Sequence, residues 1–208
     1  MIGRPLPPAL ENPRVATEAT VRHRLRDEAL ASAGWPSDAV YEFWVPRSNE
    51  RADVVVISTD MSGFEIKTER DTLKRLSRQA AAYARVFDRC SVVLAERHVA
   101  AATEMLPEWW GVVAIVSEGM APSFRSVRSA APNSGVDPET LVRLLWRQEV
   151  RAVLSALGSE PDPQASRSSM WQHLLGLVEL DRLKEAVRGA LLGRDPDVAR
   201  IPTRRFCG

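Results

Sequence analysis

A continuous apolar run, V-V-V-I at positions 54–57, constrains the fold more than any other stretch of this chain. β-Branched residues favour strands, and a strand without polar alternation is typical of one that is buried on both faces. The periodicity of apolar residues predicts helices at 15–33 and 72–87, on either side of this run in the sequence. The run therefore predicts a buried strand of an α/β fold in which helices cover the sheet.

The remaining elements predict a mixed sheet. Three successive strands favour a meander, and the strands that follow through helical crossovers favour parallel neighbours. Asp71 is a good candidate for the N-cap of the helix at 72–87, and Gly63 suits a turn that needs a positive φ. The predicted strands are 41–45, 52–58, 64–68, 91–95 and 110–116, and the predicted helices beyond those named are 98–106, 138–157, 167–177 and 179–192.

Composition limits the class of protein. The chain has 208 residues and a net charge of +1, so any surface that attracts nucleic acid must be local. Cys90 and Cys207 lie far apart and suggest neither a disulfide framework nor a zinc site. No apolar stretch reaches the length of a signal peptide or a membrane span, so we expect a cytoplasmic protein with no membrane partner. The predicted organisation is a flexible arm at 1–14, a core at 15–117, a Ser-, Ala- and Pro-rich linker at 118–137, and a C-terminal helical region with a basic tail at 138–208.

The strongest chemical signal lies between the second and third predicted strands. Side chains two positions apart on a strand share a face, so Glu65 and Lys67 project together. If the two strands pair as a hairpin, Asp53 lies beside Glu65. Two converging carboxylates suit Mg²⁺, which keeps several waters and lets a phosphate complete its shell, and a neighbouring lysine can orient a water and stabilise negative charge. The bland alternative is a surface ion pair between Glu65 and Lys67.

These residues resemble a known family. Asp53 followed by Glu65-Ile66-Lys67 resembles the D…E-x-K signature of the PD-(D/E)XK, or restriction-endonuclease-like, nuclease superfamily, with Ala52 in place of the proline. Q-A-A-A-Y at 79–83 resembles the Q-x-x-x-Y motif of the RecB-type branch, and the wider string from Gly63 resembles a small bacterial subfamily. The resemblance implies a core of helix, three strands, helix and strand over roughly 15–95.

The resemblance also implies an activity and a set of site residues. It implies a Mg²⁺-dependent deoxyribonuclease, with Mn²⁺ as a substitute metal, that acts on DNA in repair or defence. Duplex, single-stranded and branched DNA all stay open as partners, and a homodimer is compatible with cutting both strands. The alternative is a catalytically inactive module that binds nucleic acid or protein on the same fold. The implied catalytic residues are Asp53, Glu65 and Lys67; the metal ligands are Glu42, Asp53 and Glu65, with Glu18 as second choice to Glu42; and the supporting residues are Gln79, Tyr83, Arg75 and Arg78.

Other residues have simpler explanations. The basic side chains from Arg70 to Arg78 suit a phosphate track or an ordinary solvated helix face about equally. His98 fits the start of a helix better than a phosphate ligand. Trp109 and Trp110 precede an apolar strand, which favours packing into the core over stacking on bases. The chain contains no phosphate loop of the G-x-x-x-x-G-K-[ST] type, which argues against an NTPase motor.

Overall fold

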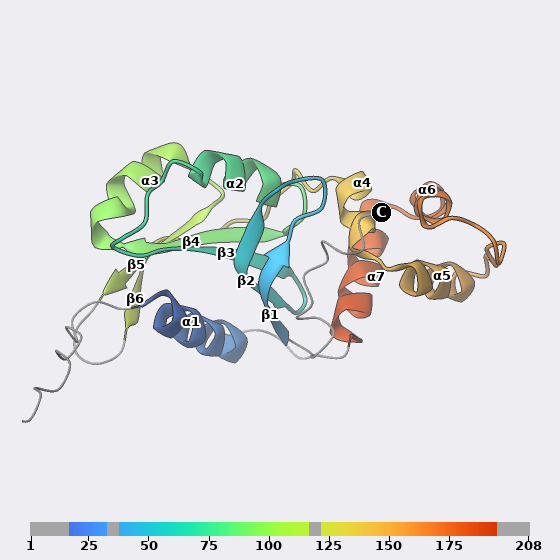
Figure 1. Cartoon of the computed structure of the whole chain (residues 1–208), viewed down its shortest axis with the longest axis horizontal. Helices are drawn as coiled ribbons and strands as arrows, with labels where there is room; N and C mark the ends of the chain where they lie inside the picture. The colour runs from blue at the N-terminus through green and yellow to red at the C-terminus, as the bar shows by residue number, and fades with distance from the viewer. Residues whose placement is uncertain (1–16, 33–37, 117–121, 195–208) are drawn as a thin grey trace, which may run out of the picture.

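The computed structural model describes residues 17–32, 38–116 and 122–194, and within them the chain forms a six-stranded sheet flanked by helices (Figure 1). The strands follow one another across the sheet in sequence order: β1 (Asp38–Trp44), β2 (Arg51–Ile57), β3 (Met61–Lys67), β4 (Arg89–Ala95), β5 (Gly111–Val116) and β6 (Ser123–Arg128). The helices are α1 (Glu18–Ser32), α2 (Leu76–Tyr83), η1 (Glu96–His98), α3 (Val99–Met105), α4 (Pro138–Leu141), η2 (Val142–Leu144), α5 (Arg147–Ala156), α6 (Arg167–Leu177) and α7 (Leu180–Leu192).

The sheet is mixed, as the sequence predicts. β1, β2 and β3 form an antiparallel meander. β4 and β5 are parallel to β3, and β6 returns antiparallel to β5. Because β3 and β4 run in the same direction, their carboxyl ends lie at one edge of the sheet, and the antiparallel β2 begins there. We call this edge the carboxyl edge.

The two faces of the sheet bury separate hydrophobic clusters. Val21 and Leu25 of α1 pack with Val54 and Val56 on one face. Val55 belongs to the larger cluster on the other face, where α2 and the C-terminal helices pack. Figure 1 shows α1 on one side of the sheet and α2 and α3 on the other. The predicted burial of β2 on both faces is therefore confirmed.

The C-terminal helices share a core with the sheet. Leu154 of α5, Leu174 of α6 and Val187 of α7 belong to the same hydrophobic cluster as the sheet residues that face α2. Asp88, just before β4, adds an ion pair to Lys184 of α7 at 2.9 Å. The segment predicted as a linker contains β6, while the division into domains stays a prediction.

Three local predictions differ from the structure. Asp71 does not cap a helix: its carboxylate accepts hydrogen bonds from the Thr68 amide and hydroxyl, which closes the turn after β3, and α2 begins later. Gly63 lies inside β3, where a Cβ atom would come within 2.5 Å of the Phe87 ring, so close packing explains the glycine. The helix predicted at 138–157 is divided into α4, η2 and α5 because the backbone is extended at Leu145 and Trp146.

Several predictions fall outside the described residues: the arm at 1–14, the basic tail and Cys207. Cys90 is buried and free of a disulfide. Trp110 is fully buried, which confirms the prediction that it packs into the core. Among the described residues, no helix is both long and apolar enough to span a bilayer.

Candidate functional site

The carboxyl edge brings the predicted hairpin carboxylates together. β2 pairs with β3 in a register that matches Val54 with Phe64, so the next positions toward this edge are Asp53 and Glu65. The Asp53 carboxylate accepts a hydrogen bond from the Ile66 amide at 2.7 Å. Burial, and after it the negative charge of Glu65, raises the pKa of Asp53 to about 7, against the opposing effects of the Ile66 amide and Lys67. The predicted convergence of the two side chains is therefore present.

Glu65 lies in a buried network that satisfies both of its carboxylate oxygens. The side chain is only 2% exposed. Lys67 and Gln79 donate to Oε1, and the Tyr83 hydroxyl lies 2.5 Å from Oε2. Gln79 and Tyr83 are four residues apart on α2, so one helix face delivers both groups to the carboxylate. The four residues that the sequence grouped are thus in contact, and Glu65 has no oxygen left without a donor.

A second group of carboxylates forms next to Asp53. Oxygens of Glu18, Glu42 and Asp53 all lie within 4.8 Å of one another, and we call these three residues the acidic cluster. Arg22 of α1 joins them: its guanidinium pairs with Glu18, lies 2.6 Å from Glu42 and 4.0 Å from Asp53. Arg51 also pairs with Glu42. The geometry therefore groups Glu18, the second choice from the sequence, with Glu42 and Asp53.

The backbone at Glu42 is strained. Its φ of +53° lies in the left-handed region, which is unfavourable for a residue with a side chain. The ladder between β1 and β2 pairs Tyr41 with Val54 and Phe43 with Ala52, but omits the intervening positions, Glu42 and Asp53. Strain of this kind persists only where surrounding contacts hold it, and it is frequent at functional sites.

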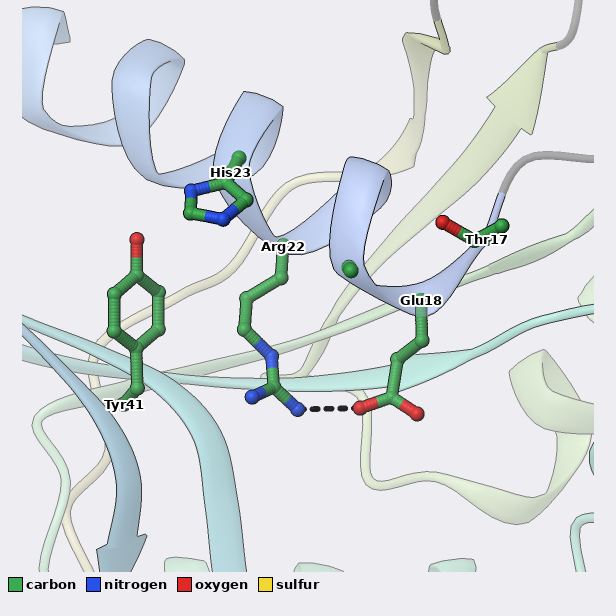
Figure 2. A pocket seen from close by; sticks show the side chains of 6 residues that line it. Thr17, Glu18, Arg22, His23 and Tyr41 are labelled. Atoms are coloured by element: carbon green, nitrogen blue, oxygen red, sulfur yellow. Dashed lines mark hydrogen bonds and ion pairs between the residues drawn. The ribbon is translucent and has the colours of Figure 1, made fainter.

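Arg22 also borders a hollow beside the acidic cluster. This hollow, of about 480 Å³, is lined by one face of α1 and by Tyr41 of β1. Figure 2 shows the Arg22 side chain between the Tyr41 ring and Glu18, with His23 above Tyr41. The lining residues are Thr17, Glu18, Ala19, Arg22, His23 and Tyr41.

Arg75 and Arg78 lie close to the site but contact a residue that the sequence did not single out. Both donate to Glu50, at 2.8 Å and 2.5 Å, and the Glu50 side chain is 2% exposed. The two arginine side chains remain 59% and 67% exposed. Burial would raise the pKa of Glu50, but the hydrogen bonds from the two guanidiniums outweigh it and lower that pKa. One carboxylate thus holds two exposed guanidiniums in fixed positions.

Sequence reasoning missed Arg22 and Glu50. A signal existed for the first, because Glu18 and Arg22 are four residues apart and such pairs meet on a helix surface. Glu50 looks like an ordinary polar turn residue, and no local pattern indicates its partners. His98 lies where η1 meets α3, and its Nε2 atom is buried without a hydrogen-bond partner among the described residues.

Comparison with known proteins gives a family for nearly the whole chain. A sequence model described as Bacteriophage P4 protein cII matches residues 14–197. This chain belongs to that family. The chain is also 24% identical over 169 residues to Protein cII of Enterobacteria phage P4, a match that covers 80% of this chain and 64% of the relative. A solved structure, the SPO1766 protein of unknown function from Silicibacter pomeroyi, is 20% identical over 62% of this chain and 83% of its own, with a TM-score of 0.37, which is too low to carry an argument.

The family assignment corrects the interpretation from motifs. The match over residues 14–197 is to the cII family and not to the PD-(D/E)XK superfamily, so the predicted membership is wrong. The predicted activity, a Mg²⁺-dependent deoxyribonuclease in repair or defence, is therefore wrong as well. The error has a physical reason: D…E-x-K is three residues on a hairpin, and a carboxylate pair with a lysine also serves as a buried hydrogen-bond network, as at Glu65. The α/β fold with a mixed sheet and C-terminal helices stands, and a restriction-endonuclease-like core is not established.

Proposed function

We propose that this protein binds DNA at the carboxyl edge of its sheet, and that a divalent cation in the acidic cluster strengthens this binding. The observation that carries the proposal is the convergence of Glu18, Glu42 and Asp53. Glu65 lies on the neighbouring strand, close enough for its charge to raise the pKa of Asp53. Carboxylates this close repel one another, and the pKa of Asp53 is raised to about 7 by burial, then by the charge of Glu65 and least by that of Glu18. A cation with two charges relieves that repulsion.

The spacing of the acidic cluster suits a single ion with oxygen ligands. Two ligand oxygens on opposite sides of one ion are separated by twice the metal–oxygen distance. This separation is about 4.2 Å for Mg²⁺ and about 4.8 Å for Ca²⁺. The ligand oxygens of Glu18, Glu42 and Asp53 all lie within 4.8 Å of one another, so Ca²⁺ fits them as they lie and Mg²⁺ fits them once any pair farther apart than about 4.2 Å moves closer. Mg²⁺, with Mn²⁺ as a substitute, leaves part of its shell to water or to a phosphate oxygen. Glu65 adds negative charge behind the ion without needing to be a ligand.

Exposed cations near the cluster supply the contacts to DNA. Arg75 and Arg78 are fixed by Glu50 and stay exposed, so they lose little side-chain freedom when they bind a phosphate. Arg70 and Lys74, in the segment between β3 and α2, are also exposed. Phosphate contacts position a protein on DNA and make its affinity depend on salt. The net charge of +1 means that this local group, and not the whole molecule, provides the attraction.

The test is a titration of fluorescently labelled duplex and single-stranded DNA, read by anisotropy in Mg²⁺ and in EDTA. We expect tighter binding in Mg²⁺ for the wild type and loss of that difference in Asp53→Asn. Arg75→Ala should weaken binding in both buffers and reduce the slope of log K against log salt by about 1. Arg182→Ala is the matched control, because Arg182 is an exposed arginine in an ion pair on α7.

Three outcomes would contradict the proposal. Equal affinity in Mg²⁺ and EDTA would remove the cation from the function. Equal losses for Arg75→Ala and Arg182→Ala would mean that the attraction is not local to the carboxyl edge. DNA recovered shortened after the titration would contradict a function of binding alone. Circular dichroism of each variant confirms that the fold is intact before binding is compared.

A further inference from the structure

We infer that Arg22 is a tethered competitor of the divalent cation, and that when the cation binds, the guanidinium moves into the adjoining hollow and takes a DNA phosphate. This inference rests on the proposed function and names the residue that couples its two ligands. In the metal-free protein, Arg22 pairs with Glu18 and lies 2.6 Å from Glu42. The guanidinium therefore lies next to all three carboxylates of the acidic cluster, where a cation would bind.

Arg22 and the cation cannot share the acidic cluster. A metal ion bound to Glu18, Glu42 and Asp53 would lie within a few ångströms of the guanidinium, which is 4.0 Å from even the farthest of the three carboxylates. Two positive charges at that distance repel strongly in a partly buried site. Arg22 already takes one oxygen of each carboxylate: Glu18 Oε1, Glu42 Oε1 and Asp53 Oδ1. Binding of the ion must displace the side chain.

The contacts of Arg22 are incomplete where it lies. A guanidinium offers five N–H donors, and the buried Nε of Arg22 has no hydrogen-bond partner among the described residues. Its ion pairs with Glu18, Glu42 and Asp53 all involve the same terminal nitrogen, Nη2. A phosphate presents several acceptor oxygens and can engage two guanidinium nitrogens together, which the carboxylates do not do here.

The hollow gives Arg22 a second position. Arg22 and Glu18 both line the hollow, and Figure 2 shows the Arg22 side chain between the Tyr41 ring and Glu18, so the guanidinium has open space next to its present position. A hollow of about 480 Å³ exceeds what one phosphate needs, and it opens beside the Tyr41 ring, over which Arg22 already lies at 6.0 Å. An aromatic ring next to a guanidinium suits a nucleotide, because bases stack on such rings.

The coupling predicts opposite effects of one substitution on two ligands. Arg22→Gln removes the competitor, so the protein should bind Mn²⁺ more tightly, by about tenfold, which is within the usual range for coupled sites. The same variant lacks the phosphate ligand, so in saturating Mn²⁺ it should bind DNA more weakly than the wild type. A merely structural role for Arg22 would weaken both.

The experiment measures Mn²⁺ binding by calorimetry and DNA binding by anisotropy on the wild type, Arg22→Gln and Arg22→Lys. Arg22→Lys keeps the charge without the planar fork, so it should compete with Mn²⁺ but hold phosphate less well. Arg24→Gln is the control on the same helix, since Arg24 pairs with Glu28, contacts none of the acidic cluster in the described part of the chain, and has a side chain that is 53% exposed. Tighter Mn²⁺ binding with weaker DNA binding in Arg22→Gln alone supports the inference. So does Mn²⁺ binding that occurs only in Arg22→Gln.

The failures are distinguishable. If the wild type and Arg22→Gln bind Mn²⁺ with the same affinity, Arg22 is not a competitor and the inference is overturned, while the proposed function stands. If neither protein binds Mn²⁺ and the wild type binds DNA equally in EDTA, the cation is absent from the function and both proposals fall.

Discussion

Substituting Tyr83 by phenylalanine tests whether Glu65 is a charged, hydrogen-bonded group in the folded protein. Tyr83 is fully buried on α2, and its hydroxyl lies 2.5 Å from Glu65 Oε2 and 2.8 Å from the Arg51 carbonyl oxygen. The hydroxyl has one proton and donates to one of these at a time. Phenylalanine keeps the ring, which stacks on Trp110 at 5.8 Å, so the variant removes the oxygen and little else.

The magnitude follows from the kind of hydrogen bond that is lost. A hydrogen bond to a charged group contributes about 1.5–3 kcal/mol, and Glu65 is only 2% exposed, so solvent has little access to replace the donor. We therefore expect Tyr83→Phe to lower the free energy of unfolding by about 2 kcal/mol. For a protein of this size that corresponds to a fall in Tm of roughly 4–8 °C. The pKa of Tyr83 is raised well above its usual value by burial and then by Glu65, so the hydroxyl stays a donor throughout the accessible pH range.

A double-mutant cycle isolates the contact. Urea unfolding, followed by circular dichroism, is measured for the wild type, Tyr83→Phe, Glu65→Gln and the double variant. Glutamine still accepts from the tyrosine but carries no charge, so in that background Tyr83→Phe should cost only about 1 kcal/mol. Tyr41→Phe is the control, since its hydroxyl bonds to none of the site carboxylates described here, and it should cost less than about 1 kcal/mol. Equal costs of Tyr83→Phe in both backgrounds would refute a charged Glu65.

Two further predictions concern the stability of the metal-free protein. The pKa of Asp53 is about 7 when folded and about 3.9 when unfolded. Between these two pKa values the folded state holds a proton that the unfolded state releases. The contribution of protonated Asp53 to the free energy of unfolding is therefore fully present below about pH 4 and is lost as the pH rises through 7, by roughly 2–4 kcal/mol. Urea unfolding from pH 4 to 8 should show Asp53→Asn gaining stability relative to the wild type as the pH rises, and a flat difference would contradict this. Gly63→Ala should cost about 1–3 kcal/mol because its Cβ would lie 2.5 Å from the Phe87 ring, whereas Gly189→Ala on α7, with open space around it, should stabilise by about 1 kcal/mol; equal effects in urea unfolding would contradict the packing argument.

The sequence predicts those features that depend on local periodicity. The V-V-V-I run places β2 in the interior because its residues alternate between two buried faces, and both clusters are present. The same alternation puts Glu65 and Lys67 on one face, and helical spacing puts Gln79 and Tyr83 opposite them. The sequence does not predict β6, because S-F-R-S-V-R forms a mostly exposed strand that pairs only with β5 among the described strands. Its residues therefore lack the apolar pattern that indicates a buried strand.

The contacts that local patterns miss join residues far apart in the chain. Glu50 meets Arg75 and Arg78 across 25 and 28 positions, and those contacts depend on the turn before β2 lying against the start of α2. Arg22 contacts Asp53 from α1, which packs on the face of the sheet that is opposite to α2. The motif gives the wrong family for a related reason: a few chemically sensible residues match many hairpins, whereas the similarity over 14–197 uses the whole pattern of the chain.

The carboxylates at this edge divide into two kinds, and the division decides which of them a cation can reach. Both oxygens of Glu65 accept hydrogen bonds from buried or partly buried side chains, those of Lys67, Gln79 and Tyr83. A cation would have to break a buried network to replace those donors, and breaking such a network is strongly unfavourable. Glu42 instead pairs with Arg22 and Arg51, whose side chains are 19% and 46% exposed, so both keep some contact with solvent. The metal set that we propose therefore differs by one residue from the set that the sequence predicts: it keeps Glu42 and Asp53 and takes Glu18 in place of Glu65.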